Sequence, residues 1–86
     1  MENLQEKTLC ELAGICCRDW SAKGKGIYFG AKPYLEAMEC LGNISEPYGA
    51  DSGKSIVAYF LANAQTWKGE VAKAVKAELN RRLKAR

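Results

Sequence analysis

The sequence predicts an all-α protein, a small single-domain bundle of about four helices. Apolar residues recur at three- and four-residue spacing in four segments, which is the period of a helix with one buried face. Glycine and proline gather in two stretches between these segments, where they indicate loops. With 86 residues, of which 48% are hydrophobic and 27% charged, the chain has the composition of one ordinary globular domain over residues 1–86.

The first predicted helix runs from Leu4 to Trp20. Asn3 and Glu6 stand three residues apart at its start, which is the spacing of a capping box. Five residues at helical spacing are expected to form its buried face: Leu9, Leu12, Ala13, Cys16 and Trp20. This pattern fits an amphipathic helix that covers one side of the core.

An exposed loop is predicted over residues 21–26, because two glycines stand there with no apolar side chain larger than alanine. The apolar residues at 27–29 are expected to anchor the far end of this loop, within an irregular or short extended segment near residues 26–30. A second helix is predicted from Pro33 to Leu41, since proline suits a first turn and Gly42 follows the last one. Its inward residues would be Tyr34, Met38 and Leu41.

Two further helices complete the predicted bundle. The third follows a loop at residues 43–50 and is expected to be capped by Asp51. Its apolar residues share one arc: Ile56, Val57, Phe60, Leu61 and Ala64. After a short break, Thr66 is expected to cap the fourth helix. Apolar residues repeat every four positions along that helix: Trp67, Val71, Val75, Leu79 and Leu83.

Basic residues are concentrated in the fourth helix. The net charge is +3, but residues 66–86 hold seven basic and two acidic side chains, whereas residues 1–65 hold six and eight. A helical wheel predicts a basic stripe opposite the apolar residues, formed by Lys73, Lys76, Asn80 and Lys84 with Arg81 beside them. Such a stripe can neutralise phosphates or meet an acidic protein surface. It also suits a solvated last turn that complements the helix dipole.

The loop between Trp20 and Tyr28 is a second candidate binding surface. Lys23 and Lys25 alternate there with glycines between two aromatic residues, a combination that suits nucleic acid or a protein hot spot as well as a plain flexible loop. The third and fourth helices could also form a helix-turn-helix. That motif reads bases with the start of its second helix, whereas the charge here gathers at the end.

The segment from Gly49 to Ser55 resembles the phosphate-binding loop of nucleotide hydrolases. The resemblance fails on spacing, because three residues instead of four separate the two glycines. What remains is a helix N-terminus that could hold an anion, formed by Ser52, Gly53, Lys54 and Ser55. Simple capping of the helix by Asp51 explains the same residues.

The residue types argue against catalysis and metal binding. The sequence contains no histidine, which removes the commonest general base. Its cysteines, at positions 10, 16, 17 and 40, lack the paired spacing of a zinc site, and Cys16 and Cys17 would point about 100° apart on a helix. We therefore expect no enzymatic activity, no metal and no cofactor. Cys16 is expected in the core, while Cys10, Cys17 and Cys40 are left as candidate reactive thiols.

The chain shows no sign of membrane insertion. No apolar run approaches the roughly 20 residues that span a bilayer, and the polar start lacks the features of a signal peptide. We therefore expect a cytoplasmic protein whose cysteines are free thiols. Because so short a chain keeps several aromatic residues, a homodimer that buries some of them is a further expectation.

Three stretches, residues 28–38, 48–64 and 67–70, resemble small proteins of unassigned function encoded by bacteriophages and prophages. No catalytic motif belongs to that group, so the resemblance implies no site residue. It implies a context in which short accessory proteins bind and block host machinery, including CRISPR and other defence systems. We therefore expect a non-enzymatic protein of phage type that inhibits a host protein or ribonucleoprotein complex by stoichiometric binding. The alternative is a small basic module that binds DNA or RNA directly.

Overall fold

The computed structural model describes residues 4–23, 26–49 and 51–84, and within them the fold is mostly α-helical, as predicted. Four α-helices form the body, and a two-stranded hairpin and two 3-10 turns are added to it. In chain order the elements are η1 (Leu4–Glu6), α1 (Leu9–Ser21), η2 (Phe29–Ala31), α2 (Lys32–Met38), β1 (Pro47–Tyr48), β2 (Asp51–Ser52), α3 (Gly53–Ala62) and α4 (Glu70–Lys84).

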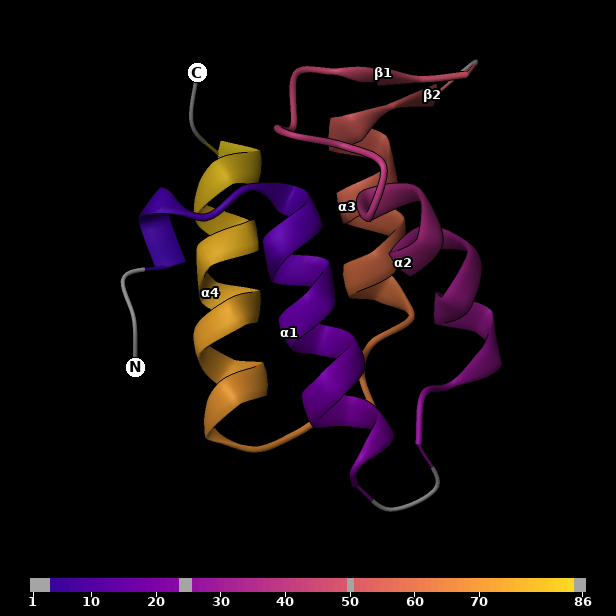
Figure 1. The fold of residues 1–86 in the computed structure, drawn as a ribbon, viewed down its shortest axis with the longest axis vertical. Coiled ribbons are helices and arrows are strands. Elements are labelled where there is room, and N and C mark those ends of the chain that lie inside the picture. The colour runs from indigo at the N-terminus through magenta and orange to yellow at the C-terminus, as the bar shows by residue number, and fades with distance from the viewer. Residues whose placement is uncertain (1–3, 24–25, 50, 85–86) are drawn as a thin grey trace.

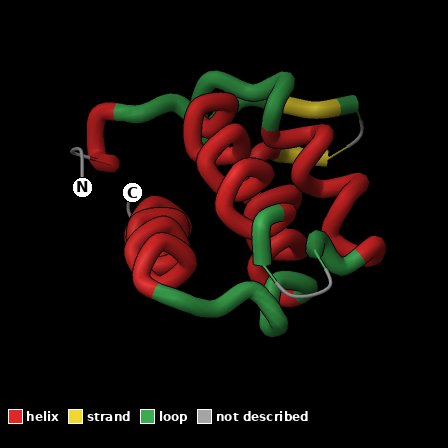
Figure 2. The backbone as a smooth tube through the Cα atoms, turned by 60° about the horizontal axis from the view of Figure 1, so that its bottom comes forward, coloured by secondary structure: helices red, strands yellow, loops and turns green. Residues whose placement is uncertain are grey.

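The four helices form a ring around a single core. Helix α1 packs against α2 and α4, and α3 packs against the same two neighbours from the other side (Figure 1; Figure 2). The hairpin lies at the start of α3, with Pro47 opposite Ser52 and Tyr48 opposite Asp51. No helix in the described ranges is long and apolar enough to cross a bilayer.

Helix α1 begins at Leu9, later than the predicted Leu4. The capping box is formed by Thr8 and Glu11: the Thr8 hydroxyl accepts a hydrogen bond from the Glu11 N–H at 3.1 Å, and the Glu11 carboxylate accepts one from the Thr8 N–H at 2.9 Å. The predicted capping box was therefore misplaced, and Asn3 lies outside the described residues. The predicted inward face of α1 is confirmed, because all five of its residues are buried.

Helix α4 begins at Glu70, so Thr66 does not cap it and Trp67 does not lie in its first turn. Gly69 breaks the helical path with a φ of 112°, a conformation that favours glycine. Trp67 is nevertheless fully buried, because the link between α3 and α4 turns its side chain into the core. Val75 and Leu79 are buried as predicted, and Val71 and Leu83 pack against the edge of the core.

The start of α3 also differs from its prediction. Ser52 is the N-cap, since its Oγ accepts a hydrogen bond from the Ser55 N–H at 3.1 Å, while Asp51 pairs with Tyr48 in the hairpin. Gly53 passes close under the preceding loop and donates its N–H to the Glu46 carbonyl at 2.8 Å. The sequence did not reveal the hairpin, because its strands are only two residues long.

The segment near residues 26–30 is irregular, which is one of the two predicted alternatives, and it leads into the 3-10 turn η2. Ile27 packs against the core and anchors the loop as predicted. Tyr28 and Phe29 do not, since they are 44% and 75% exposed. The strands of the protein therefore lie later in the chain, at residues 47–52.

Two glycine-to-alanine variants should shift stability in opposite directions. A Cβ at position 53 would lie 2.8 Å from the Ile44 carbonyl oxygen, so Gly53→Ala should lower the free energy of unfolding by about 1–3 kcal/mol. Gly14→Ala should raise it by about 0.5–1 kcal/mol, because the new methyl meets only the flexible end of Arg18 within a helix. Urea denaturation of both variants checks this, and equal shifts would contradict the close approach at Gly53.

Candidate functional site

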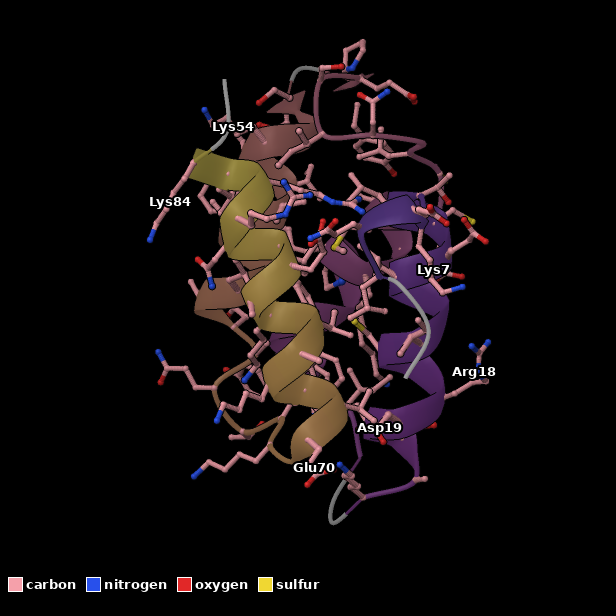
Figure 3. The ribbon with its side chains drawn as sticks, turned by 90° about the vertical axis from the view of Figure 1, so that its left-hand side faces the viewer. Lys7, Arg18, Asp19, Lys54, Glu70 and Lys84 are labelled. Atoms are coloured by element: carbon pink, nitrogen blue, oxygen red, sulfur yellow. The ribbon has the colours of Figure 1, made fainter. Side chains whose placement is uncertain are left out.

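The predicted basic stripe of α4 is only partly available in the structure. Lys73, Asn80 and Lys84 are exposed, and Lys84 points away from the bundle (Figure 3). Lys76 is not on the open surface. Its Nζ donates a hydrogen bond to the Trp67 carbonyl at 2.6 Å and lies 5.8 Å from the centre of the Trp67 ring. Burial lowers the pKa of Lys76, and its ammonium serves the fold.

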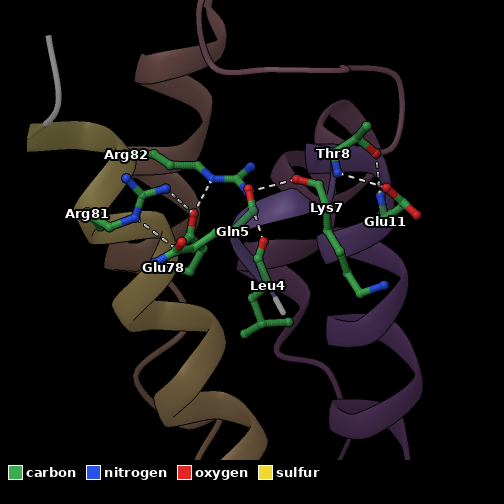
Figure 4. Close-up of polar contacts among 8 residues, drawn as sticks. All are labelled: Leu4, Gln5, Lys7, Thr8, Glu11, Glu78, Arg81 and Arg82. Atoms are coloured by element: carbon green, nitrogen blue, oxygen red, sulfur yellow. Dashed lines mark hydrogen bonds and ion pairs between the residues drawn. The ribbon is translucent and has the colours of Figure 1, made fainter. Parts of the chain in front are cut away.

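The arginines at the end of α4 are also committed to contacts within the protein (Figure 4). Arg81 donates Nε and Nη2 to the two carboxylate oxygens of Glu78, at 2.9 and 2.6 Å. Arg82 donates Nε to the same carboxylate at 2.6 Å and Nη2 to the carbonyls of Leu4 and Lys7 at 3.0 and 2.7 Å. The pKa of Glu78 is lowered by its hydrogen bonds, chiefly the one from Arg81.

Two lysines of the stripe therefore remain as available cations. The Asn80 amide donates to the Lys76 carbonyl one turn earlier, so it faces its own helix. Within the described ranges, the side chains of Lys73 and Lys84 make no hydrogen bond or ion pair. The stripe lies on the outer side of α4, as predicted, but it has fewer available charges than the sequence suggested.

Lys23, predicted to belong to a second binding surface, also serves as a structural clamp. Its Nζ lies 2.9 Å from Asp19 Oδ2 and donates to the Lys68 carbonyl at 2.9 Å. The Trp67 indole N–H donates to the same Asp19 oxygen at 2.9 Å. Hydrogen bonds from Lys23 and then from Trp67 lower the pKa of Asp19. Lys25 lies outside the described residues.

The helix end predicted as an anion site has few open donors. The N–H of Gly53 is bonded to Glu46, and the N–H of Ser55 is bonded to the Ser52 hydroxyl. The Ser52 hydroxyl in turn lies 3.1 Å from the Ser55 hydroxyl. Lys54 is exposed beside them. The four residues lie together as predicted, but the helix end is capped from within the chain.

Of the cysteines, Cys16 lies in the core as predicted. Cys16 is buried, and burial raises the pKa of its thiol to about 12. Burial also raises the pKa of Cys17, whereas Cys10 and Cys40 are exposed. In the described part of the chain, no three acidic, histidine or cysteine side chains gather where they could hold a metal ion.

Sequence reasoning missed a surface that we call the aromatic face, formed by Tyr28, Phe29, Tyr34 and Tyr59. Phe29 is 75% exposed, Tyr59 50% and Tyr28 44%, while Tyr34 is partly buried. The rings form two pairs. The Tyr28 and Phe29 ring centres are 5.1 Å apart, and those of Tyr34 and Tyr59 are 5.5 Å apart.

Both ring pairs lie along the seam between α2 and α3. A Cβ on Gly30 would lie 2.5 Å from the Tyr28 ring and 3.2 Å from the Asn63 amide oxygen, so Gly30 and Asn63 face each other. Gly30 precedes Tyr34 by four residues, and Asn63 follows Tyr59 by four. The two helices therefore run antiparallel, and the ring pairs stand about one helical turn apart.

A sequence signal for this face does exist. No residue between Lys54 and Lys68 is charged, yet the structure exposes Ala58, Tyr59 and Ala62 on the outer side of α3. A helix that is uncharged all round is normally covered on all sides. The outer side of α3 nevertheless faces solvent.

Comparisons with protein-family models, with curated proteins and with solved structures give no match for this chain. The structure itself presents two surfaces of different chemistry. One is the aromatic face on α2 and α3, where Lys32 and Glu36 of α2 are also exposed, and the other carries two separated lysines on α4.

The buried Glu78 should make stability depend on pH. Glu78→Gln should lower the free energy of unfolding at pH 7 by about 1–3 kcal/mol, because Arg81 and Arg82 lose a charged acceptor. The lowered pKa of Glu78 means that this contribution is present above the ordinary value of 4.5 and disappears as the pH falls through the lowered pKa of the folded state.

Urea denaturation at pH 7 and pH 3 should therefore show a difference between wild type and variant that shrinks in acid. Glu36→Gln, an exposed change on α2, is the matched control and should stay within about 0.5 kcal/mol of wild type. A difference that is the same at both pH values would show that the Glu78 charge contributes nothing.

Proposed function

We propose that the protein works by binding another protein and that the aromatic face is its contact surface. The observation that carries this proposal is the exposure of Phe29 and its tyrosine neighbours, which form two ring pairs beside the uncharged run of residues 55–67. Contiguous apolar surface on a small protein marks interaction sites, and tyrosine is enriched among the residues that dominate binding energy. Aromatic rings also bury a large area when a partner covers them.

The face is held in place before binding. Its rings come from η2, α2 and α3, which pack against one another, and each ring contacts a second ring. Aromatic side chains have two rotatable bonds, so few conformations are lost when they are covered. A preformed surface of this kind loses little entropy on association, which favours tight stoichiometric binding.

The acidic side chains support binding in preference to catalysis. Glu11 caps α1, Asp19 holds Trp67 and Lys23, and Glu78 holds two arginines. Glu46 accepts hydrogen bonds from the backbone N–H groups of Gly42 and Asn43. Each of these four carboxylates is engaged in the fold, so none of the four is available as an acid or base for a substrate.

The resemblance to small phage proteins supplies the proposed biological role. The protein is an accessory factor of phage type that acts in the host cytoplasm and inhibits a protein or ribonucleoprotein defence complex of the host, CRISPR effectors included. Such inhibition requires tight binding at a position where the bound protein blocks the target's own function. A rigid bundle with one aromatic face meets that requirement.

Direct binding of DNA or RNA is the second candidate, and the exposure of Lys73 and Lys84 on α4 favours it. Each phosphate that a lysine neutralises adds about −0.9 to the slope of log affinity against log salt. Two lysines therefore support only weak binding with a shallow slope. The helix-turn-helix arrangement gains no support, because α4 opens with Glu70 and carries its free cations farther along.

Removing either exposed ring should strongly weaken partner binding. Phe29→Ser and Tyr59→Ser should each weaken binding at least about 30-fold, which corresponds to a hot spot of about 2 kcal/mol. Because Phe29 is largely exposed, Phe29→Ser should change stability by no more than about 0.5 kcal/mol, whereas Tyr59→Ser also loses the ring contact with Tyr34 and should cost about 1 kcal/mol. Protection of phage in a challenged host and quantitative co-purification of the host partner measure the effect.

The paired variant Lys73→Glu with Lys84→Glu is the control on the opposite surface. Full inhibition by this control and none by the ring variants supports the proposal. The reverse result contradicts it and favours the basic stripe. A fall from dimer to monomer in Tyr59→Ser, seen by analytical ultracentrifugation, would instead assign the aromatic face to a homodimer.

The nucleic-acid candidate has its own test. Gel-shift titration of bare duplex and single strand at 50 and 200 mM salt should show weak binding to either, with a salt slope no steeper than about −2. Tight binding that falls steeply with salt and is lost in the paired lysine variant would replace the protein-binding proposal.

A further inference from the structure

A hollow of about 400 Å³ lies between the end of α1 and the link from α3 to α4, toward the lower end of the molecule in Figure 1. Its size falls within the range of small-ligand pockets. The residues that line it are Trp20, Lys23, Gly26, Ile27, Tyr28, Thr66, Trp67 and Lys68.

The apolar part of this hollow is largely aromatic and is packed against the core. Trp20 and Trp67 form the floor, stacked at 5.8 Å with their rings 15° apart, and both are almost wholly buried. Ile27 packs against the core and Tyr28 stands half exposed at the edge. These side chains offer apolar and aromatic contact to a flat guest.

Two lysines supply the charges at the hollow. One of them, Lys23, is already paired with the Asp19 carboxylate 2.9 Å away, so the unpaired positive charge is that of Lys68. None of the described residues that line it carries a carboxylate, whereas Lys23 and Lys68 both line it. The Lys23 ammonium has three N–H donors, of which Asp19 and the Lys68 carbonyl occupy two. The third donor is left for an acceptor. The side chain of Lys68 is exposed beside it.

Gly69 makes room for this ammonium. A Cβ at position 69 would collide with Lys23 Nζ, and the φ of 112° there favours glycine in any case. The position of Lys23 is therefore determined from two sides, by its hydrogen bonds and by the absent side chain of Gly69. A donor fixed in this way meets an acceptor with little loss of side-chain entropy.

We propose that this hollow binds a flat apolar group that carries a carboxylate, supplied by a free aromatic acid or by the C-terminal aromatic residue of a peptide. The ring lies against Ile27 and Tyr28, and the carboxylate accepts the third N–H of Lys23 and pairs with Lys68. The site needs no partner on the aromatic face, although Tyr28 belongs to both.

The test uses indole-3-acetate and the peptide Gly-Gly-Trp as the two probes, with indole-3-acetamide and the peptide amide as uncharged controls. Binding to the full chain is followed by calorimetry and by amide chemical shifts of Ile27, Thr66 and Lys68. The acid of at least one probe should bind at least about fivefold more tightly than its amide. The probe that binds more tightly identifies the source of the ligand.

Two variants keep the result tied to this hollow. Lys68→Glu should weaken acid binding at least about fivefold, and Thr66→Trp should block the hollow without changing charge. Lys73→Glu makes the same charge change on α4 and should have no effect. The proposal is overturned if neither acid binds at millimolar concentration, if acid and amide bind equally, or if both pocket variants bind like the wild type.

Discussion

The burial of Trp67 in the link between α3 and α4 organises the fold. Its ring stacks on Trp20 of α1 and lies 6.5 Å from Phe60 of α3, its indole N–H is bonded to Asp19, and its carbonyl accepts the ammonium of Lys76 from α4. One side chain thus contacts three of the four helices. The burial of this residue determines the path of the link and therefore the position of α4. Gly69 then supplies the bend from which α4 begins.

Seating Trp67 also determines which charges are left on the surface. An indole N–H and a link carbonyl inside the protein need partners, and Asp19 and Lys76 supply them. Lys23 then pairs with Asp19 and joins α1 to the link. Cations that look available on a helical wheel are drawn into the fold in this way, while uncharged rings on α2 and α3 stay outside. The surface that we propose as the contact site is therefore aromatic, although the composition of the C-terminal helix is basic.

The helices and their inward faces could be predicted because helical periodicity is a local property of the sequence. All five predicted core residues of α1 are buried, and Val75 and Leu79 of α4 are as well. Thr8 was missed as a cap because Asn3 with Glu6 and Thr8 with Glu11 share the same spacing. Trp67 continued the four-residue repeat of α4 by coincidence, since the link turns it inward from outside the helix.

The candidate site was harder to predict because it depends on contacts distant in sequence. Lys76 meets a residue nine positions away, and Lys23 meets one that is 45 positions away. Neither contact produces a periodic pattern in the sequence. The aromatic face required knowing which side of α3 its neighbours leave open, which only the packing of α2 against α3 decides. The uncharged run around Tyr59 was visible in the sequence, but burial explained it equally well.

One guanidinium links the turn at residues 4–7 to helix α4. Arg82 reaches the carbonyls of Leu4 and Lys7, 78 and 75 residues away, while its other nitrogen is bonded to Glu78. These hydrogen bonds join the first turn to the last helix. We therefore expect the two elements to unfold as one cooperative unit. A truncation that removes Arg82 frees the carbonyls of the N-terminal turn at once, so damage at one terminus is transmitted directly to the other.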